Sequence, residues 1–230
     1  MVQFDPAQPL AARTFAELAM ELHGAPSVTE TVEAALDFAV QAVRCAHSGL
    51  MLAEGARLCT GAVTDPAVEA IYRWERAAGD GPALTALREQ ITIGVRDTRA
   101  ETRWVGWSNV VTALGIGSVL HTPLAIGAET VGVLSLYAGR IDAFGNDDLA
   151  IAHILARHAS IAVAAARHQE SMVQAVDARK LIGQAMGVLM MKFDVDEQRA
   201  FAILKRYSQH HNRKLREVAQ EVVDTRSLPR

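Results

Sequence analysis

Cysteine is scarce in this sequence, which contains only Cys45 and Cys59 in 230 residues. Two thiols cannot supply the disulfide framework of a small secreted protein, so we expect a reducing, cytoplasmic environment. The first ten residues contain neither a basic nor an apolar segment, which predicts that no signal peptide is present. Apolar runs such as 161–166 are short, and we expect no membrane span.

The motifs of the common enzyme and metal classes are also missing. The sequence has no G-x-S-x-G element, no Walker loop and no G-x-G-x-x-G fingerprint. His153 and His158 are five residues apart, so a helix would place them on different faces. Cys45 and His47 are close in sequence, but no second pair completes a tetrahedral zinc site. We therefore expect neither an enzyme nor a structural metal.

Apolar residues make up 50% of the chain and charged residues 21%, which is an ordinary globular balance. The net charge of −3 is unevenly distributed. Residues 1–169 contain 12 basic and 18 acidic side chains, a net charge of −6. Residues 170–230 contain 11 basic and 8 acidic side chains, a net charge of +3. An acidic body followed by a basic segment predicts two domains with separate roles.

The hydrophobic pattern of the first part predicts a mixture of helices and strands. Helices are expected at 14–23, 28–44, 65–76 and 83–89, with Ser27 or Thr29 capping the second of them. Strands are expected at 48–53, 56–60, 91–95, 118–126 and 130–138, of which the last two form an antiparallel hairpin. Residues 99–114 are expected to be irregular. This order favours an α+β sandwich with helices on one face of an antiparallel sheet and loops on the other.

A long helix is predicted after Phe144, with Asn146 as its N-cap and no proline from Leu149 to Met191. Its first half has an apolar stripe and a stripe of small residues. The apolar stripe contains Ile151, Ile154, Leu155, Ala159 and Ala162, and the other contains Ala152, Ala156, Ser160 and Val163. These stripes could pair two copies of the chain, or they could cover the sheet of their own domain.

Several short segments resemble a GAF domain, a sensor module for small molecules or redox signals. They are Gly81-Pro82-Ala83-Leu84, Ile91–Asp97, Ser118–Leu124, Val131–Leu136 and the helix that follows Asp147. The resemblance covers about residues 14–168, and it implies a concave ligand pocket.

Three residues are candidates for contact with a ligand in that pocket. Trp104 and Trp107 could stack on a planar ligand or fill the core, and His121 could bind a haem or make an internal hydrogen bond. Haem is the disfavoured alternative, and the sequence leaves the ligand or cofactor unknown.

Three helices are predicted after His168. The first covers about 177–192, where Gly183 and Gly187 would allow close backbone approach. The second begins near Asp194, with Glu197 completing a capping box, and the third begins at Asn212. Their apolar faces predict a small three-helix bundle. Those faces contain Leu181, Ala185, Val188, Leu189, Ala200, Phe201, Leu204, Tyr207, Leu215, Val218, Ala219, Val222 and Val223.

Residues 199–216 contain six Lys and Arg side chains and no acidic residue. This run spans the end of the second helix, the following turn and the start of the third helix. Cations, amide groups and a helix N-terminus gathered in this way are typical of a surface that binds nucleic acid.

The same region resembles an ANTAR domain, the RNA-binding module of transcription antitermination regulators. The resemblance covers about 170–225 and rests on 179–190, 200–209 and 212–219. Many members have Lys where this chain has Met186, so a contact made by that lysine is not expected here. The family implies a homodimer that binds tandem RNA hairpins and prevents a terminator from forming. Such modules are usually fused to a sensor, either a phosphorylated receiver or a GAF domain. No receiver-type acidic cluster precedes the module here, so we expect a ligand or partner protein, rather than phosphorylation, to provide the signal.

We therefore predict a tail at 1–13, a GAF-like domain at 14–168, an ANTAR-like domain at 169–225 and a tail at 226–230. The expected fold class is α+β, with a long connecting helix and a C-terminal all-α bundle. The predicted RNA-binding residues are Arg179, Lys180, Lys205, Arg206, Gln209, Asn212, Arg213, Lys214 and Arg216. Alternative functions are a DNA-binding regulator, a sensor that docks an acidic protein, and an enzyme that uses the pocket.

Overall fold

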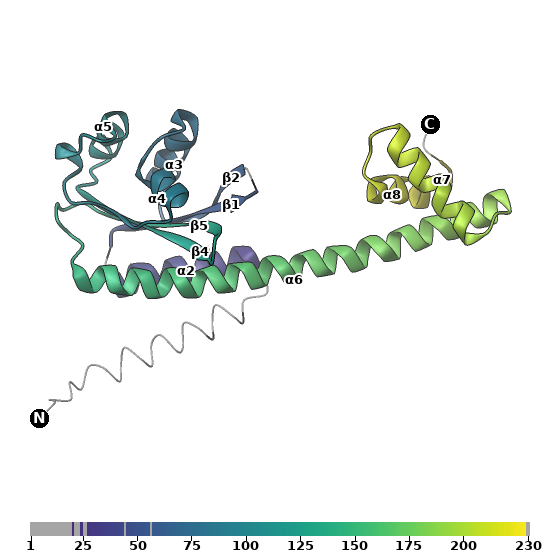
Figure 1. The fold of residues 1–230 in the computed structure, drawn as a ribbon, viewed down its shortest axis with the longest axis horizontal. Coiled ribbons are helices and arrows are strands. Elements are labelled where there is room, and N and C mark those ends of the chain that lie inside the picture. Colours follow the sequence, from purple (N-terminus) through teal and green to yellow (C-terminus); the bar gives the residue numbers. More distant parts are fainter. Residues whose placement is uncertain (1–19, 21–23, 25–26, 44, 56, 229–230) are drawn as a thin grey trace, which may run out of the picture. The chain divides into compact units, whose positions relative to one another are not determined.

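The computed structural model describes residues 20, 24, 27–43, 45–55 and 57–228. Contacts divide the chain into two compact units, the first ending at Arg167 and the second beginning at His168. Figure 1 labels the elements of both units. Apart from Met20, the helix predicted at 14–23 lies outside the described residues.

The first unit is built on a five-stranded antiparallel sheet, as the sequence predicts. The strands follow the order β2-β1-β5-β4-β3. Their bounds are Arg57–Val63 for β2, His47–Glu54 for β1, Glu129–Ala138 for β5, Ser118–Ile126 for β4 and Ile93–Val95 for β3. Strands β4 and β5 form the predicted hairpin, in which Leu120 faces Leu136. Strand β3 is shorter than the predicted 91–95, because it pairs with β4 only from Ile93 to Val95.

Helices cover both faces of this sheet, so the prediction of a face covered by loops is wrong. On one face lie α2 (Val28–Val43) and the start of α6 (Asn146–Phe193); on the other lie α3 (Pro66–Ala78), α4 (Pro82–Glu89) and α5 (Val105–Ala113) (Figure 1). Alternate strand residues serve the two layers: Leu50 packs on the α2 side, whereas Met51 packs on the α3 side. A short 3-10 turn, η1 (Thr98–Ala100), precedes α5. The segment 99–114, expected to be irregular, therefore contains a helix.

Local hydrogen bonds explain where several of these helices begin. The Ser27 hydroxyl accepts from the Glu30 amide and donates to its carboxylate, at 3.2 Å in each case, so Ser27 caps α2. Asp65 caps α3 by accepting from the Ala67 amide at 2.8 Å. The prediction that Asn146 caps α6 is wrong, because Asn146 is already helical. The amide of the preceding Gly145 donates to the Asp148 carboxylate at 2.9 Å.

Helix α6 runs without interruption from Asn146 to Phe193. Its small-residue stripe packs in the core beneath the sheet, and this observation supports the alternative in which the first half covers its own domain. Of the predicted apolar stripe, Ile154 is 42% exposed. By length and composition α6 is long and apolar enough to cross a membrane, and 44% of the qualifying window is buried within the structure. Core helices of soluble proteins satisfy the same criteria.

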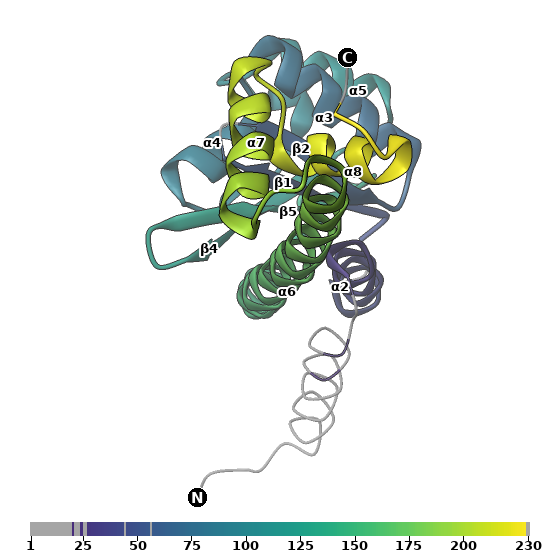
Figure 2. The same ribbon diagram turned by 90° about the vertical axis from the view of Figure 1, so that its right-hand side faces the viewer.

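The second unit is the predicted bundle of three helices. The end of α6, α7 (Glu197–His210) and α8 (Leu215–Thr225) enclose a core of Ala185, Leu189, Ala200, Leu204, Val218, Ala219 and Val222. Figure 2 shows α7 and α8 on two sides of α6. Phe201, predicted to lie in the core, is 40% exposed because the apolar face of α7 is narrower than expected. A Cβ atom added at Gly183 or Gly187 would meet nothing within 4 Å in the described structure, so the predicted close backbone approach is not seen there.

Both predicted N-caps of the second unit are wrong. Asp196, rather than Asp194, caps α7 by accepting from the Arg199 amide at 2.8 Å. Helix α8 begins after Lys214, with no side-chain cap, rather than after Asn212. Asp194 and Asn212 instead adopt left-handed backbone conformations, with φ of 51° and 48°, and Arg226 after α8 does the same with φ of 53°. Left-handed residues reverse the chain direction between helices.

Candidate functional site

A cluster of buried polar side chains lies between the sheet and the layer formed by α3, α4 and α5. Five of its atoms make no hydrogen bond of normal distance and angle in the described part of the chain: Tyr72 Oη, Glu75 Oε1, Trp107 Nε1, His121 Nε2 and Tyr137 Oη. Four of them lie close to one another, because the Trp107 indole approaches the Glu75 carboxyl group and the Tyr72 and Tyr137 hydroxyls approach each other and Ser135. The ring of His121 lies 6.4 Å from that of Trp107 and 5.8 Å from that of Tyr137, between centroids. Its Nδ1 is 2.8 Å from the hydroxyl oxygen of Ser135. We call these six side chains the sensor interior.

Burial shifts the pKa values of all four titratable groups in the sensor interior: it raises those of Tyr72, Tyr137 and Glu75 and lowers that of His121. Only the shifts of Glu75 and His121 bear on protonation near neutral pH. Burial raises the pKa of Glu75 to about 8, although amide hydrogen bonds from α4 oppose the shift. One of these bonds joins the Leu84 amide to Glu75 Oε2 at 3.1 Å, at the N-terminus of α4. Burial lowers the pKa of His121 to about 3. At neutral pH the interior therefore contains a mostly protonated carboxyl group and a neutral imidazole.

The structure brings together all three predicted pocket residues on this side of the sheet. Trp107 and His121 are fully buried within the sensor interior, and Trp104, 9% exposed, belongs to the same apolar cluster as Trp107. The Arg103 guanidinium lies 4.4 Å above the Trp104 ring. Glu75 was not among the predicted site residues, although the sequence contains a signal for it: Glu75 occupies the apolar stripe of α3, seven residues after Val68.

The polar atoms of the sensor interior determine which hydrogen bonds it can form. Each buried donor or acceptor without a partner costs about 1–3 kcal/mol, unless a water molecule or a polar guest satisfies it. The indole of Trp107 can only donate, whereas the two tyrosine hydroxyls can donate or accept. The sensor interior therefore contains both donors and acceptors, although its side chains line none of the described hollows.

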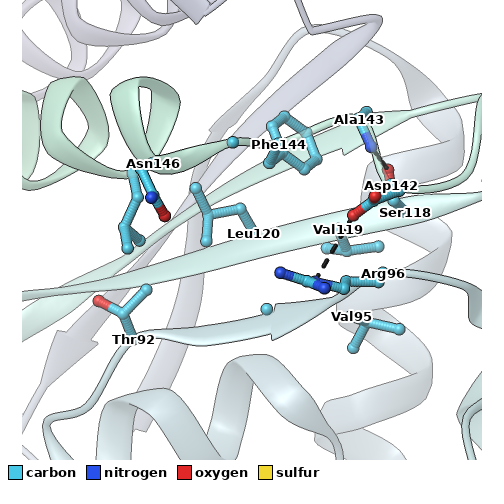
Figure 3. A pocket seen from close by; sticks show the side chains of 13 residues that line it. Thr92, Val95, Arg96, Ser118, Val119, Leu120, Asp142, Ala143, Phe144 and Asn146 are labelled. Carbon is cyan, nitrogen blue, oxygen red and sulfur yellow. Dashed lines mark hydrogen bonds and ion pairs between the residues drawn. The ribbon is translucent and has the colours of Figure 1, made fainter.

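Hollows also lie elsewhere among the described residues of the first unit. One, of about 260 Å³, lies between β3, β4 and the start of α6, where Arg96 Nε is 3.5 Å from Asp142 Oδ1 (Figure 3). Another, of about 660 Å³, is lined by the end of β4 and by α6, and there His153 Nε2 is 2.7 Å from Thr92 Oγ1. Among the described residues no group of three or more His, Cys, Asp or Glu side chains could hold a metal ion.

The predicted RNA-binding residues all belong to the second unit. Eight of the nine are exposed. They are Arg179 and Lys180 on α6, Lys205, Arg206 and Gln209 on α7, Asn212 in the turn, Lys214 before α8 and Arg216 on α8. Arg213 differs, because its guanidinium pairs with Glu221 at 2.8 Å and its charge is partly neutralised. Its backbone also fixes the turn, since the Ser208 hydroxyl donates to the Arg213 carbonyl at 2.6 Å.

The cations of α7 are divided between two flanks of the helix. With 3.6 residues per turn, Lys205 and Gln209 share one flank. Arg199, Arg206 and His210 share the neighbouring flank. The run of cations at 199–216 therefore does not form one continuous corner on α7, because the helical turn separates its members.

Two family models match the sequence. The GAF domain model matches residues 25–164, more than half of the chain, and the ANTAR domain model matches residues 170–223. No curated protein matches the chain.

Solved structures support the first of these matches at the level of the fold. The GAF domain of a phosphoenolpyruvate-protein phosphotransferase from Coxiella burnetii superposes with a TM-score of 0.54 at 14% identity, covering 73% of this chain and 99% of that chain. The GAF domain of the corresponding Acinetobacter protein gives a TM-score of 0.53 at 12% identity, covering 69% of this chain and 95% of that chain.

GAF and ANTAR domains are both regulatory modules, the former binding small ligands or partners and the latter binding RNA. The sensor interior lies within the residues matched by the first model, and the exposed cations lie within those matched by the second. The chain belongs to the GAF domain family and carries a C-terminal ANTAR domain, an organisation that makes it a sensor-regulated ANTAR regulator.

Proposed function

We propose that this chain is an RNA-binding antitermination regulator whose GAF domain controls the binding of tandem RNA hairpins by its ANTAR domain. The observation that supports this most directly is the exposed run of cations at 199–216, which contains no acidic residue. Lys and Arg that neutralise phosphates release counterions and so provide most of the affinity for nucleic acid. The proposal places the protein in the cytoplasm, where it would meet nascent transcripts.

We assign different roles to the exposed residues of the ANTAR domain. Lys205 and Lys214 contact phosphates, and so do Arg179, Lys180, Arg206 and Arg216. Gln209 and Asn212 are amides that can read the edges of unpaired bases. Arg213, paired with Glu221, supports the turn that presents Asn212.

We further propose that the active form is a homodimer. Beyond Arg167, α6 exposes a group of large apolar side chains, among them Met172 at 56%, Val173 at 53% and Val176 at 65%. A second copy of α6 would remove these side chains from water. Two linked ANTAR domains would then bind two hairpins with a higher apparent affinity than either domain alone.

The signal would enter through the sensor interior. His121 Nε2, a buried nitrogen without a hydrogen-bond partner among the described residues, supports a small polar ligand as the signal, with Trp104 and Trp107 nearby. Such a ligand would change RNA binding only to the extent that it binds two conformations of the chain with different affinities.

The first test measures binding of the full chain to two RNAs of one composition, across a range of salt concentrations. One RNA carries two short hairpins in tandem, and the other is a duplex without loops. We expect binding that depends on both hairpins. Equal, weak and salt-sensitive binding to both RNAs would show that the surface binds nucleic acid only through non-specific electrostatic attraction. A preference for a DNA duplex would favour the alternative DNA-binding function.

Charge variants then test the surface itself. Lys205→Ala and Lys214→Ala should each weaken binding and lower the salt slope by about one. Arg73→Ala, which removes an exposed cation from α3, serves as the control for net charge and should leave the slope unchanged. A slope that stays the same in both lysine variants would contradict the assignment.

A further inference from the structure

A hollow of about 250 Å³ opens on the second unit, beside the C-terminal half of α7. It is lined by Ile203, Arg206, Tyr207, His210, His211 and Leu228. Its volume is below the range typical of pockets for drug-sized ligands, so it suits a single ring system. None of the nine predicted RNA-binding residues except Arg206 lines it.

One wall of the hollow is formed by stacked aromatic rings. The rings of Tyr207 and His211 are stacked, with centroids 4.0 Å apart and planes inclined by 19°. The ring of His210 meets that of His211 edge-on, with centroids 5.1 Å apart. Nδ1 of His211 lies 3.1 Å from the Tyr207 carbonyl oxygen, which can only accept, so Nδ1 carries a proton and fixes the ring. The stacked pair is therefore oriented before any ligand arrives.

The rest of the hollow is apolar on one side and cationic on the other. Ile203 and Leu228 are partly buried and pack against the core of the bundle, so they form a firm apolar wall. Arg206 and His210 stand one turn apart on the same flank of α7, and Arg199 lies two turns before Arg206. A planar ring flanked by phosphates matches this combination, because aromatic faces stack on bases and guanidinium groups bind phosphates.

We propose that this hollow seats one unstacked base of an RNA loop, packed against the Tyr207–His211 pair, while Arg206 binds an adjoining phosphate. The proposal rests on the proposed function and deepens it, because it names a base rather than a phosphate as the ligand. It assigns base recognition to the flank of α7 next to the one that carries Lys205 and Gln209. Discrimination between hairpin and duplex follows, since a paired base cannot leave its stack without cost.

The test begins with selection of a two-hairpin RNA from a pool with randomised loops, using the full chain and a duplex competitor. Each loop base of the selected RNA is then removed in turn, leaving the ribose and the phosphate. We expect the loss of one particular base to weaken binding about tenfold, as the stacking of one base on an aromatic side chain contributes. Removal of the other bases should have smaller effects.

Two sets of protein variants connect that base to the hollow. Leu228→Trp fills the hollow without changing any charge, so it should weaken binding about tenfold, leave the salt slope unchanged and abolish the effect of removing the critical base. His211→Ala should have a similar effect, whereas His211→Phe should restore binding because it keeps an aromatic face. Circular dichroism of each variant checks that the bundle is folded.

The outcomes separate this proposal from the proposed function. If the selected hairpins bind but every abasic position has the same effect in the parent chain and in Leu228→Trp, the base seat is refuted and the proposed function stands. If binding is equally weak for His211→Ala and His211→Phe, the aromatic wall is not the contact. If no hairpin is enriched over the duplex, the proposed function fails and the base seat fails with it. Binding of an acidic peptide that competes with RNA, unaffected by base removal, would assign the hollow to a protein.

Discussion

Replacing Glu75 by glutamine should reverse the pH dependence of the stability of the GAF domain between pH 6.5 and 8. Glu75 is fully buried, and burial raises its pKa from the ordinary value of 4.5 to about 8. The folded domain therefore holds a proton that the unfolded chain has already released in this range. The stabilisation from Glu75 is complete below pH 4.5, and it is lost as the pH rises through 8.

The magnitude follows from the number of protons released on unfolding. One proton per molecule changes the free energy of unfolding by about 1.4 kcal/mol per pH unit. Glu75 alone should thus lower the free energy of unfolding by between about 1 and 2 kcal/mol from pH 6.5 to 8. His121 acts in the opposite direction, because burial lowers its pKa from 6.5 to about 3 and the unfolded chain loses its proton in this range. That gain is less than about 0.5 kcal/mol, so a net loss of about 1 kcal/mol remains.

The assay is urea unfolding followed by tryptophan fluorescence at several pH values. All three tryptophans, Trp74, Trp104 and Trp107, lie in the first unit, so the signal reports on that unit alone. In Glu75→Gln the titrating carboxyl is gone, and the stability should rise slightly with pH rather than fall. If the parent domain showed no loss of stability between pH 6.5 and 8, or if the glutamine variant kept the same loss, Glu75 would not be a buried protonated carboxyl.

Three further predictions concern packing, charge and capping. Gly132→Ala should lower the free energy of unfolding of the first unit by about 1–3 kcal/mol in the same assay, because the new methyl group would collide with the carbonyl oxygen of Met51. Gly94→Ala is the control: its methyl group would meet open space, so it should lower the free energy of unfolding far less. Arg213→Gln should lower the salt slope of RNA binding by clearly less than Lys205→Ala does, because Arg213 already pairs with Glu221; an equal reduction would show that the pair opens on binding. Asp196→Ala should destabilise α7 by about 1 kcal/mol, measured by faster hydrogen exchange of its amides, and Asp196→Asn should keep most of the protection.

The sequence predicts the sheet well, because alternating apolar residues and turn residues close in the sequence specify its strands. The hairpin of β4 and β5 alternates between two apolar layers and turns at Gly127, whose φ of 60° favours glycine. Helix α5 was missed because its residues include Gly106 and several β-branched side chains, which have low helix propensity. Burial of Trp107 and Val111 in α5 outweighs that propensity, and such burial is a tertiary effect.

The caps of the second unit show a different limit of sequence analysis. Asp194, Asp196 and Asn212 are all good N-cap residues, and spacing alone does not decide among them. The chain must first reverse direction after α6, and Asp194 is used for that turn. The sensor interior was recognised only in part for a similar reason. Trp107 and His121 could be predicted as residue types, whereas Tyr72 and Tyr137 join them only through the pairing of distant strands and helices.

The left-handed residues that follow the three helices of the ANTAR domain have a consequence for how its stability can be adjusted. Asp194, Asn212 and Arg226 adopt a conformation that costs an L-amino acid of order 1 kcal/mol and glycine almost nothing. Each of these residues therefore lowers the free energy of unfolding of the domain by a small amount. The substitutions Asp194→Gly and Arg226→Gly would remove this backbone strain without altering the core or the proposed RNA-binding residues. The stability of the domain can thus be changed by substitutions at its helix junctions, which are separate from the surface on which its specificity would depend.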